Sequence, residues 1–430
     1  MANAPDLQFW LLGFILVTAY FSVSLILSAS APVKVWLLGS GEKADTLSGA
    51  TVARNLAMIC VSVLIFVLTG MNNLIVLIPL TALVYWSGKG IMTSPKEKAF
   101  WICLSVIIFV TVVFCYNEYY VYLLLNRMIS NLNALPLKNV MLVPGISYLI
   151  LRVIHFSIEC YRKRIKDLDF LTFLNYILFF PSFFGGPLIR YNQFSEDIYN
   201  SSVSIDYVGG IRRIIEGFFK KVVLCRFLLP YLLANTDLVS PSLTRTRVIL
   251  GLYAYMFHVY FHFSGYTDIS IGCGKLLGIN LPENFNKPFL KKNLQQFWVS
   301  WNMTVTSWLT EYIYWPVAGK TRDIQQLRTR PILSASMAII VTFVVCGMWH
   351  WATINFIVWG IYNGVGLSIL NCYRSFRKKH FSRKWKDYVT SSWYAGVAST
   401  VLTFQFVAFG FLILRCDFKQ IEQLWYLFLR

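Results

Sequence analysis

One imidazole lies between two long apolar runs. His350 ends the run that begins near Phe343 and precedes the run that ends near Gly364. An ionisable side chain at membrane depth is costly and marks a functional site by default. Because its reference pKa is about 6.5, a histidine can act as a general base at neutral pH. His350 is therefore the candidate base of a reaction centre.

A second polar group lies upstream in an aromatic segment. The segment runs from Phe297 to Pro316 and carries Asn302, several serines and threonines, and Glu311. Lipid does not tolerate such a face, so we expect it to point into a protein interior or a water-filled cavity. Asn302 can donate to a developing oxyanion, or fix the tautomer of His350 through its carbonyl. The pair suits activation of a hydroxyl that attacks an acyl carbonyl.

Other polar residues within apolar runs have both a structural and a functional interpretation. Arg152, His155 and Glu159 fall on one helical stripe, which is either a buried ion-pair lock or part of a tunnel lining. His258 and His262 share a helical face, but the glutamate of an HExxH motif and a third ligand are missing. We therefore predict that the two histidines are hydrogen-bonded groups in a bundle and that the chain has no metal site.

Acidic and sulfur-containing residues of the same region have simpler interpretations. The nine cysteines form no CxxC pair, so neither a zinc site nor a disulfide framework is indicated. Cys346 precedes His350 by one helical turn, which would permit an acyl relay, but a small buried hydrophobe is the default. Ion pairs are expected between the acidic residues Asp268 and Glu283 and the basic residues Lys275, Lys287 and Arg190.

The composition requires a membrane. The 430 residues are 57% hydrophobic and 17% aromatic, whereas soluble domains are about 45–50% apolar. A span needs about 20 apolar residues, and we count roughly ten to twelve spans or half-spans. The first, near 9–30, lacks a cleavage pattern and is interpreted as a retained helix. The others lie near 55–70, 73–88, 99–122, 139–160, 170–189, 214–235, 247–272, 297–316, 332–350, 353–372 and 393–415.

The organisation follows from these runs. We predict an all-α, polytopic protein that forms one integral-membrane domain over residues 1–430. Its parts are peripheral helices at 1–135, a core at 140–372 that holds nearly every polar intramembrane residue, and a C-terminal helix and tail at 393–430. The Gly-Gly-Pro at 185–187 is expected to break a helix, and the turn-rich loop Leu281 to Pro288 separates two membrane segments.

A net charge of +19 is concentrated in loops between the spans. The positive-inside rule and contact with anionic lipids account for it without nucleic acid. The alternative is that some bases guide an acidic donor to a cytosolic entrance. The clusters at 161–166 and 374–386 predict cytosolic loops.

Five stretches, in order, resemble the membrane-bound O-acyltransferase family. The nearest branch is the bacterial one that includes alginate O-acetyltransferase membrane subunits and teichoic-acid D-alanyl transferases. Together the stretches cover about 140–415. They are PGISYLILRVIHFSIECYRKRI (144–165), FLNYILFFPSFFGGPLIRYNQF (173–194), YFHFSGYTDISIGCGKLLGINLPENFNKPF (260–289), FWVSWNMTVTSWLTEYIYWPVAGK (297–320) and GMWHWATINFIVWGIYNG (347–364).

This resemblance implies a helical bundle around a central tunnel. Its invariant histidine maps onto His350 and its second polar position onto Asn302, which is His in the bacterial branch and Asn in many eukaryotic members. No tightly bound cofactor is implied; the co-substrate is an acyl thioester, either acetyl-CoA or an acyl-carrier protein with phosphopantetheine. The donor enters from the cytosol, and a second acyl-relay subunit is a frequent partner. Further tunnel residues are expected to be Trp298, Trp301, Thr306, Trp349, Asn363, His262, His155 and Arg152.

The sequence also departs from the branch at positions near the expected tunnel. Thr310 and Glu311 replace Arg-Asp, and His262 lies where the branch has Asp in a YFDFSGY motif. Trp351 replaces a glycine after the invariant histidine, and we expect its ring to narrow the space beside His350. That narrowing favours a small acyl group such as acetyl or alanyl.

The prediction is a multi-pass enzyme of the bacterial inner membrane. It would move a small acyl group from a thioester to a hydroxyl of a cell-envelope glycan or glycopolymer, with His350 as general base. One alternative places the acceptor hydroxyl on a lipid or a protein. Two others are a transporter of acyl groups or glycans, because broken helices with polar interiors suit both functions, and a catalytically silent scaffold.

Overall fold

The computed structural model describes residues 49–68, 74–130, 145–183, 185–199, 205–228, 244–351, 353–382, 392–416 and 418–429. Within these ranges the chain is helical, and extended pairing is limited to one antiparallel bridge between Phe285 and Trp301. The all-α prediction is confirmed. The helix predicted near 9–30 lies outside the described residues.

The chain divides into two compact units. The first contains the residues up to Gly217 together with Tyr266–Pro282, and the second contains Phe218–Gly265 and the residues from Glu283 onward. The helix α10 (Arg245–Leu276) therefore starts in the second unit and ends in the first. The prediction of a single integral-membrane domain is not tested by this division and stays a prediction.

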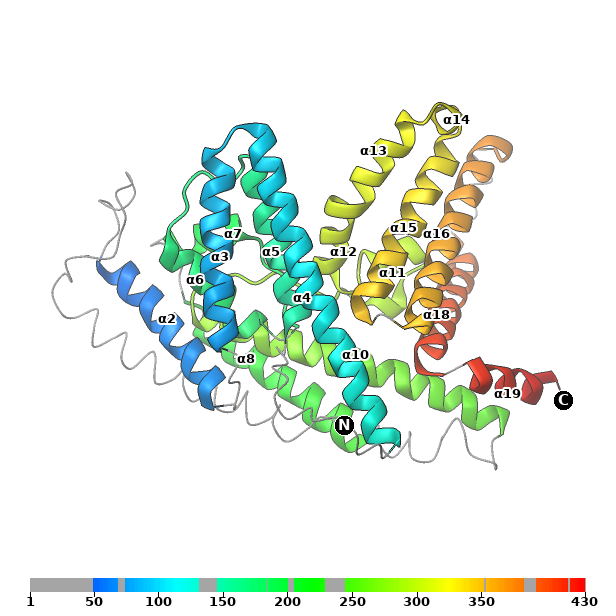
Figure 1. Cartoon of the computed structure of the whole chain (residues 1–430). Helices are drawn as coiled ribbons and strands as arrows, with labels where there is room; N and C mark the ends of the chain where they lie inside the picture. The colour runs from blue at the N-terminus through cyan, green and yellow to red at the C-terminus, as the bar shows by residue number, and fades with distance from the viewer. Residues whose placement is uncertain are drawn as a thin grey trace. The chain divides into compact units, whose positions relative to one another are not determined.

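The first unit is a set of packed helices. Among them α3, α4 and α5 contact one another pairwise, and α2 packs on α6 (Figure 1). Gly88 of α3 lies directly under the ring of Phe156 in α5, where an added Cβ would be only 2.6 Å from the ring. Its elements are α2 (Gly49–Leu68), α3 (Leu74–Thr93), α4 (Lys96–Ser130), α5 (Ile146–Tyr161), α6 (Phe170–Leu178), η2 (Phe180–Ser182), α7 (Tyr191–Tyr199) and α8 (Tyr207–Phe218).

The predicted helix break before Gly-Gly-Pro is confirmed. The helix α6 ends at Leu178, and a single turn, η2, precedes an irregular stretch. The guanidinium of Arg152 donates to the carbonyl of Tyr176 at 3.1 Å and to both the carbonyl and the hydroxyl of Ser182. A buried cation therefore satisfies carbonyl groups that the helix end leaves without intrahelical partners.

The second unit is built around the antiparallel pair α15 and α16, which lie side by side (Figure 1). Glycines allow the two backbones to approach closely, since a Cβ on Gly360 would lie 2.4 Å from the carbonyl oxygen of Phe343. Its elements besides α10 are η3 (Phe219–Leu228), η4 (Pro288–Leu290), α11 (Leu294–Trp298), α12 (Met303–Leu309), η5 (Thr310–Tyr314), α13 (Trp315–Asp323), α14 (Gln325–Arg328), α15 (Pro331–His350), α16 (Ile354–His380), α18 (Trp393–Arg415) and α19 (Phe418–Leu429).

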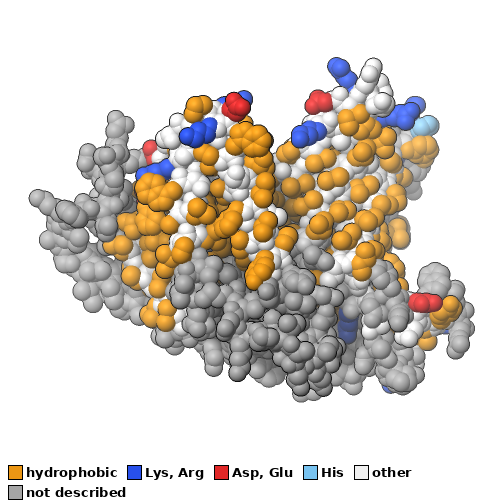
Figure 2. Space-filling model, viewed as in Figure 1, with side chains coloured by type: hydrophobic (Ala, Val, Ile, Leu, Met, Phe, Trp, Pro, Cys, Tyr) orange, Lys and Arg blue, Asp and Glu red, His pale blue; other side chains and the backbone are white. Residues whose placement is uncertain are grey.

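Four described helices are long and apolar enough to cross a membrane: Lys96–Tyr116, Pro331–His350, Ile354–His380 and Trp393–Arg415. Figure 2 shows hydrophobic side chains over the outer surface of α15 and α16, as contact with lipid requires. The segment predicted near 297–316 is not one continuous span, because it is divided into α11, α12, η5 and the start of α13. The total of ten to twelve spans or half-spans stays a prediction.

Candidate active site

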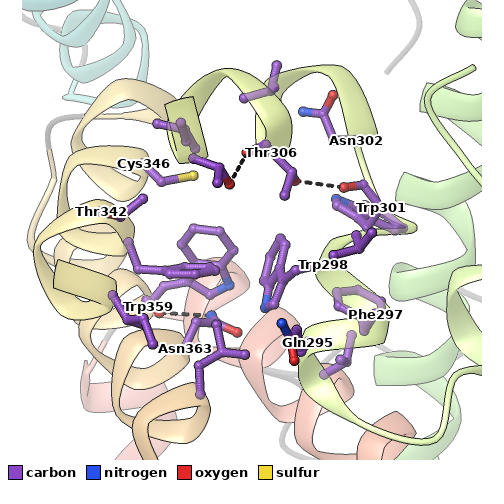
Figure 3. Close-up of a pocket in the computed structure, with 18 of the residues that line it drawn as sticks. Gln295, Phe297, Trp298, Trp301, Asn302, Thr306, Thr342, Cys346, Trp359 and Asn363 are labelled. Carbon is purple, nitrogen blue, oxygen red and sulfur yellow. Dashed lines mark hydrogen bonds between the residues drawn. The ribbon is translucent and has the colours of Figure 1, made fainter. Parts of the chain in front are cut away.

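One cavity of about 610 Å³ lies within the second unit. Its walls come from α10, α11, α12, η5, α15, α16 and α18, and most of its lining is aromatic or aliphatic (Figure 3). Both predicted reactive side chains, His350 and Asn302, are among the lining residues. A largely apolar cavity of this size with a few convergent polar groups is typical of a small-molecule site.

Asn302 occupies a left-handed turn immediately before α12. Its φ is 44° and its ψ is 52°, a conformation that Asn adopts more readily than most residues. Its carbonyl accepts a hydrogen bond from the amide of Thr306 at 2.9 Å, which starts the helix. The side chain is buried, and its amide oxygen is enclosed without a hydrogen-bond partner among the described residues.

A neighbouring loop holds this turn on both sides. The amide of Asn286 donates to the carbonyl of Ser300, and the amide of Met303 donates to the carbonyl of Asn284, each at 3.0 Å. The side-chain oxygen of Asn284 accepts from both the amide and the hydroxyl of Thr304, at 3.2 and 2.6 Å. We call this set of contacts the 284–286 clamp. Asn284 has no exposed surface.

His350 is the last residue of α15, at the turn that reverses the chain into α16. Its side chain is exposed, and its ring lies 5.8 Å from the ring of Trp359 in an edge-on arrangement and 6.4 Å from that of Phe356. The described part of the chain gives neither ring nitrogen a hydrogen-bond partner. An imidazole at the wall of a cavity with free nitrogens is in the state that a base requires.

Four further predicted tunnel residues line the same cavity: Trp298, Trp301, Thr306 and Asn363. Figure 3 shows the ring of Trp298 between Asn363 and the turn that holds Asn302. Trp349 and His262 belong to this unit but do not line the cavity. The wall also includes residues that the sequence did not predict as tunnel lining, among them Thr342, Gln295 and Arg374.

The sequence predicted that the ring of Trp351 narrows the space beside His350, but other rings line the cavity there. Trp351 follows α15 in an extended conformation and does not line the cavity. The ring nearest to His350 is that of Trp349, at 4.6 Å, and the large rings that line the cavity beside His350 are those of Phe356 and Trp359, because the chain turns back at once and α16 packs against α15.

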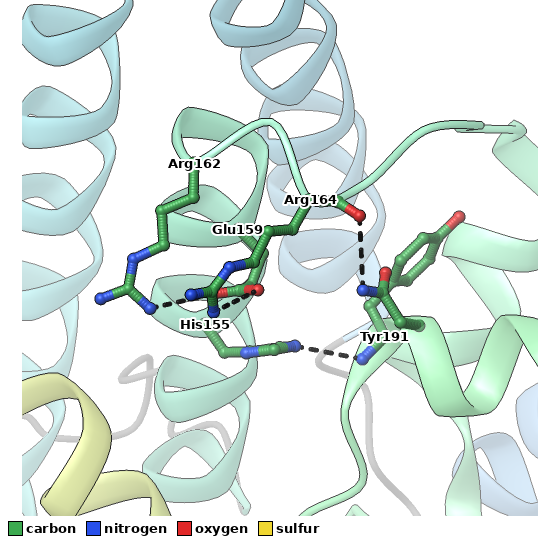
Figure 4. Close-up of polar contacts among 6 residues, drawn as sticks. His155, Glu159, Arg162, Arg164 and Tyr191 are labelled. Atoms are coloured by element: carbon green, nitrogen blue, oxygen red, sulfur yellow. Dashed lines mark hydrogen bonds and ion pairs between the residues drawn. The ribbon is translucent and has the colours of Figure 1, made fainter.

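Arg152 and His155 lie in the first unit, where their contacts are structural. The Nε2 of His155 accepts a hydrogen bond from the backbone amide of Tyr191 at 3.1 Å (Figure 4). Glu159 pairs with Arg162 at 3.2 Å and with Arg164 at 3.4 Å. The three members of the predicted stripe therefore each bind different neighbours, and the cavity lining includes none of them.

The remaining polar residues have different contacts, and the hydrogen bond predicted for His258 is not seen at its Nδ1, which is buried without a partner among the described residues. The rings of His258 and His262 stack with centroids 6.2 Å apart. Asp268 pairs with Arg213 at 2.7 Å, whereas Lys275, one of its predicted partners, pairs with Asp206. The reason is that α8 and α10 cross closely at their glycines, which brings Arg213 to Asp268.

Comparison with known proteins shows the family to which the chain belongs. The model of the membrane-bound O-acyltransferase family matches residues 78–395. The teichoic acid D-alanyltransferase of Bacillus subtilis (strain 168) is 30% identical over 286 residues, which are 65% of this chain and 70% of that protein. A probable alginate O-acetylase of Pseudomonas syringae pv. tomato is 27% identical over 374 residues, 85% of this chain and 67% of that protein.

A third relative is the peptidoglycan O-acetyltransferase of Helicobacter pylori, 32% identical over 219 residues, which are 50% of this chain and 40% of that protein. With a family model that covers most of its length, the chain belongs to the membrane-bound O-acyltransferase family. It is an integral membrane protein and an acyltransferase.

Proposed function

We propose that this protein moves an acetyl or D-alanyl group from a thioester to a hydroxyl of a cell-envelope polymer. The relatives are named for teichoic acid, alginate and peptidoglycan, which supports a polymeric acceptor. The observation that carries the mechanism is that His350 and Asn302, predicted separately from the sequence, line one cavity. The site of action on this proposal is the bacterial inner membrane.

The reaction needs one base and one oxyanion donor or orienting group. A ring nitrogen of His350 takes the proton of the acceptor hydroxyl while its oxygen attacks the thioester carbonyl carbon. Asn302 steadies the resulting oxyanion or orients the imidazole. The carbon–sulfur bond then breaks, and the departing thiolate takes the proton from the imidazolium. The products are an ester on the acceptor and a free thiol.

The shape of the cavity supports a long donor with an anionic end. Its lining on α16 extends from Phe356 to Arg374, about 27 Å along a helix that rises about 1.5 Å per residue. Arg374 is held beside α11 by the side-chain oxygens of Asn293 and Gln295. A cation at one end and His350 toward the other suit acetyl-CoA or a phosphopantetheine arm, whose phosphate is far from the thioester. The basic last turn of α16, which carries Arg377, Lys378 and Lys379, would contact an acidic carrier.

A small acyl group fits the rings around the base. Phe356, Trp359 and Trp298 all line the cavity, and Trp298 lies 5.6 Å from Trp359. Because Phe356 and Trp359 also lie next to His350, bulky rings occupy the space around the base, which favours a short acyl group.

A transfer assay in membrane vesicles tests this proposal. Vesicles that contain the protein and an envelope polymer are supplied with labelled acetyl-CoA, a D-alanyl-carrier protein or a long-chain acyl-CoA. Label on polymer hydroxyls from a short-chain donor is the expected result. Label from long-chain donors alone would contradict the small-acyl proposal, label on lipid or protein would move the acceptor, and passage of label without ester formation would indicate a transporter.

A further inference from the structure

The 284–286 clamp contains one enclosed amide atom without a partner, and a second belongs to Asn302, next to the clamp residue Met303. One is the side-chain nitrogen of Asn284, and the other is the side-chain oxygen of Asn302. Both residues are buried, with exposed fractions of 0% and 5%. The first atom can only donate and the second can only accept. Buried polar atoms are normally hydrogen-bonded, so a complementary donor and acceptor left unpaired, one of them on a residue that lines the cavity, call for a functional explanation.

The orientation of Asn284 is fixed by its neighbours. Its side-chain oxygen accepts from the amide and the hydroxyl of Thr304, so a flipped amide would place a donor against the donor N–H of Thr304. The bond from the amide of Met303 to the carbonyl of Asn284 keeps the two segments in register. The N–H₂ group of Asn284 therefore stays on the side opposite its bonds to Thr304.

The two ends of the Asn302 amide are in different environments. Among the described residues, the side-chain oxygen of Asn302 is both enclosed and unpaired. The side-chain nitrogen is not. Because Asn302 lines the cavity, the nitrogen is the end with access to a ligand there.

We infer that Asn284 is a positioning residue: its side-chain N–H donates to the amide oxygen of Asn302, directly or through one bound water, in the reacting enzyme. That bond holds the N–H₂ of Asn302 toward the cavity. This inference rests on the proposed acyl transfer. It decides between the two roles predicted for Asn302, which are to donate to the oxyanion and to orient His350. Asn302 donates to the oxygen of the thioester carbonyl, whose charge grows in the transition state, and does not act as an acceptor for His350.

The central test is Asn284→Asp, which keeps an oxygen for Thr304 and removes the donor. We expect kcat to fall about 10–100-fold with the KM for the thioester unchanged. Asn302→Ala should lower kcat about 100–1000-fold, and adding Asn284→Asp to it should cause no further loss of kcat.

The pH dependence gives a second test. The ratio of the kcat of Asn284→Asp to the kcat of the parent should rise as the pH falls, because protonation of the introduced carboxylate restores a donor. A role confined to folding would not produce that pH dependence.

Two other variants keep the inference testable if Asn284→Asp does not fold. Asn302→Asp replaces the cavity-facing donor by an acceptor, so transfer should be lost; retained transfer would overturn the inference. Ser307→Ala is the matched control, since it removes a hydroxyl that donates to the carbonyl of Thr304 at 2.9 Å but lies outside the clamp and the cavity lining, and it should keep kcat within about 3-fold. Normal transfer by both His350→Ala and Asn302→Ala would instead refute the proposed function. Loss in those two with parental kcat in Asn284→Asp would refute only the inference.

Discussion

At the scale of single residues, His350 and Asn302 could be found from sequence because each is polar where lipid-facing positions are apolar. Asn284 could not. It lies in a loop whose composition predicts only a turn, and its importance arises from hydrogen bonds to Thr304 and Met303 that no local pattern encodes. The sequence shows only an asparagine in a short loop between Pro282 and Pro288.

Whether the thiol of Cys346 becomes acylated distinguishes direct transfer from an acyl relay. Its thiol is buried and lines the cavity one helical turn before His350. Direct attack on the thioester needs no second nucleophile, so Cys346→Ala should keep kcat within about 3-fold of the parent. The check is a kinetic assay with acid-trapped protein analysed by intact mass. An acylated thiol in the parent, together with loss of transfer in the variant, would establish the relay.

Arg374 gives a prediction about the donor. Removing its charge with Arg374→Gln should raise the KM for acetyl-CoA or a carrier-bound donor about 10-fold or more, because charge-assisted hydrogen bonds to phosphate contribute about 1.5–3 kcal/mol. The KM for an acetyl thioester without phosphate should not change. Equal effects on both donors would mean that Arg374 supports the fold and does not contact a phosphate.

At the scale of elements, the close pairing of α15 and α16 places His350 on the cavity wall. A side chain at Gly360 would meet the backbone of Phe343, so Gly360→Ala should lower stability by about 1–3 kcal/mol and reduce transfer. Gly319→Ala is the control, since no atom lies within 4 Å of the Cβ position there. Thermal unfolding in detergent measures both. Equal Tm values for the two variants would contradict a tight α15–α16 contact.

Arg152 tests whether the polar stripe of α5 is structural. Without the guanidinium, the carbonyls of Tyr176 and Ser182 lose their donors inside the first unit. Arg152→Ala should therefore lower the yield and Tm of the protein, while kcat per folded molecule stays near the parental value. A folded variant that has lost transfer would restore Arg152 to the substrate path.

The same scale explains what the sequence could and could not predict about the fold. Hydropathy located α15, α16 and α18 because each is a long apolar run. The division of the 297–316 segment follows from the left-handed turn at Asn302 and the 284–286 clamp, which depend on contacts between two segments and not on local hydropathy. The partner of Asp268 was missed for the same reason, since it depends on how α8 crosses α10.

At the scale of the whole molecule, the cavity, the predicted base and the predicted oxyanion donor all belong to the second unit. The first unit contains a helix break satisfied by Arg152 and an ion-pair cluster around Glu159. The family model spans parts of both units. A net charge of +19 on a membrane protein is expected to favour contact with anionic lipid headgroups, and contact with an acidic carrier stays a prediction. Contact with a second, acyl-relay subunit stays a prediction.

The most direct test of acyl transfer by His350 is mass and NMR analysis of envelope polymers from three strains. One strain carries the gene, one lacks it, and one carries His350→Ala at a matched protein level. We predict an ester that is present in the first strain and absent from both others, since removing a general base typically costs 10²–10⁴-fold in rate. An ester that is lost on deletion but kept in His350→Ala would contradict the central claim that His350 is the base.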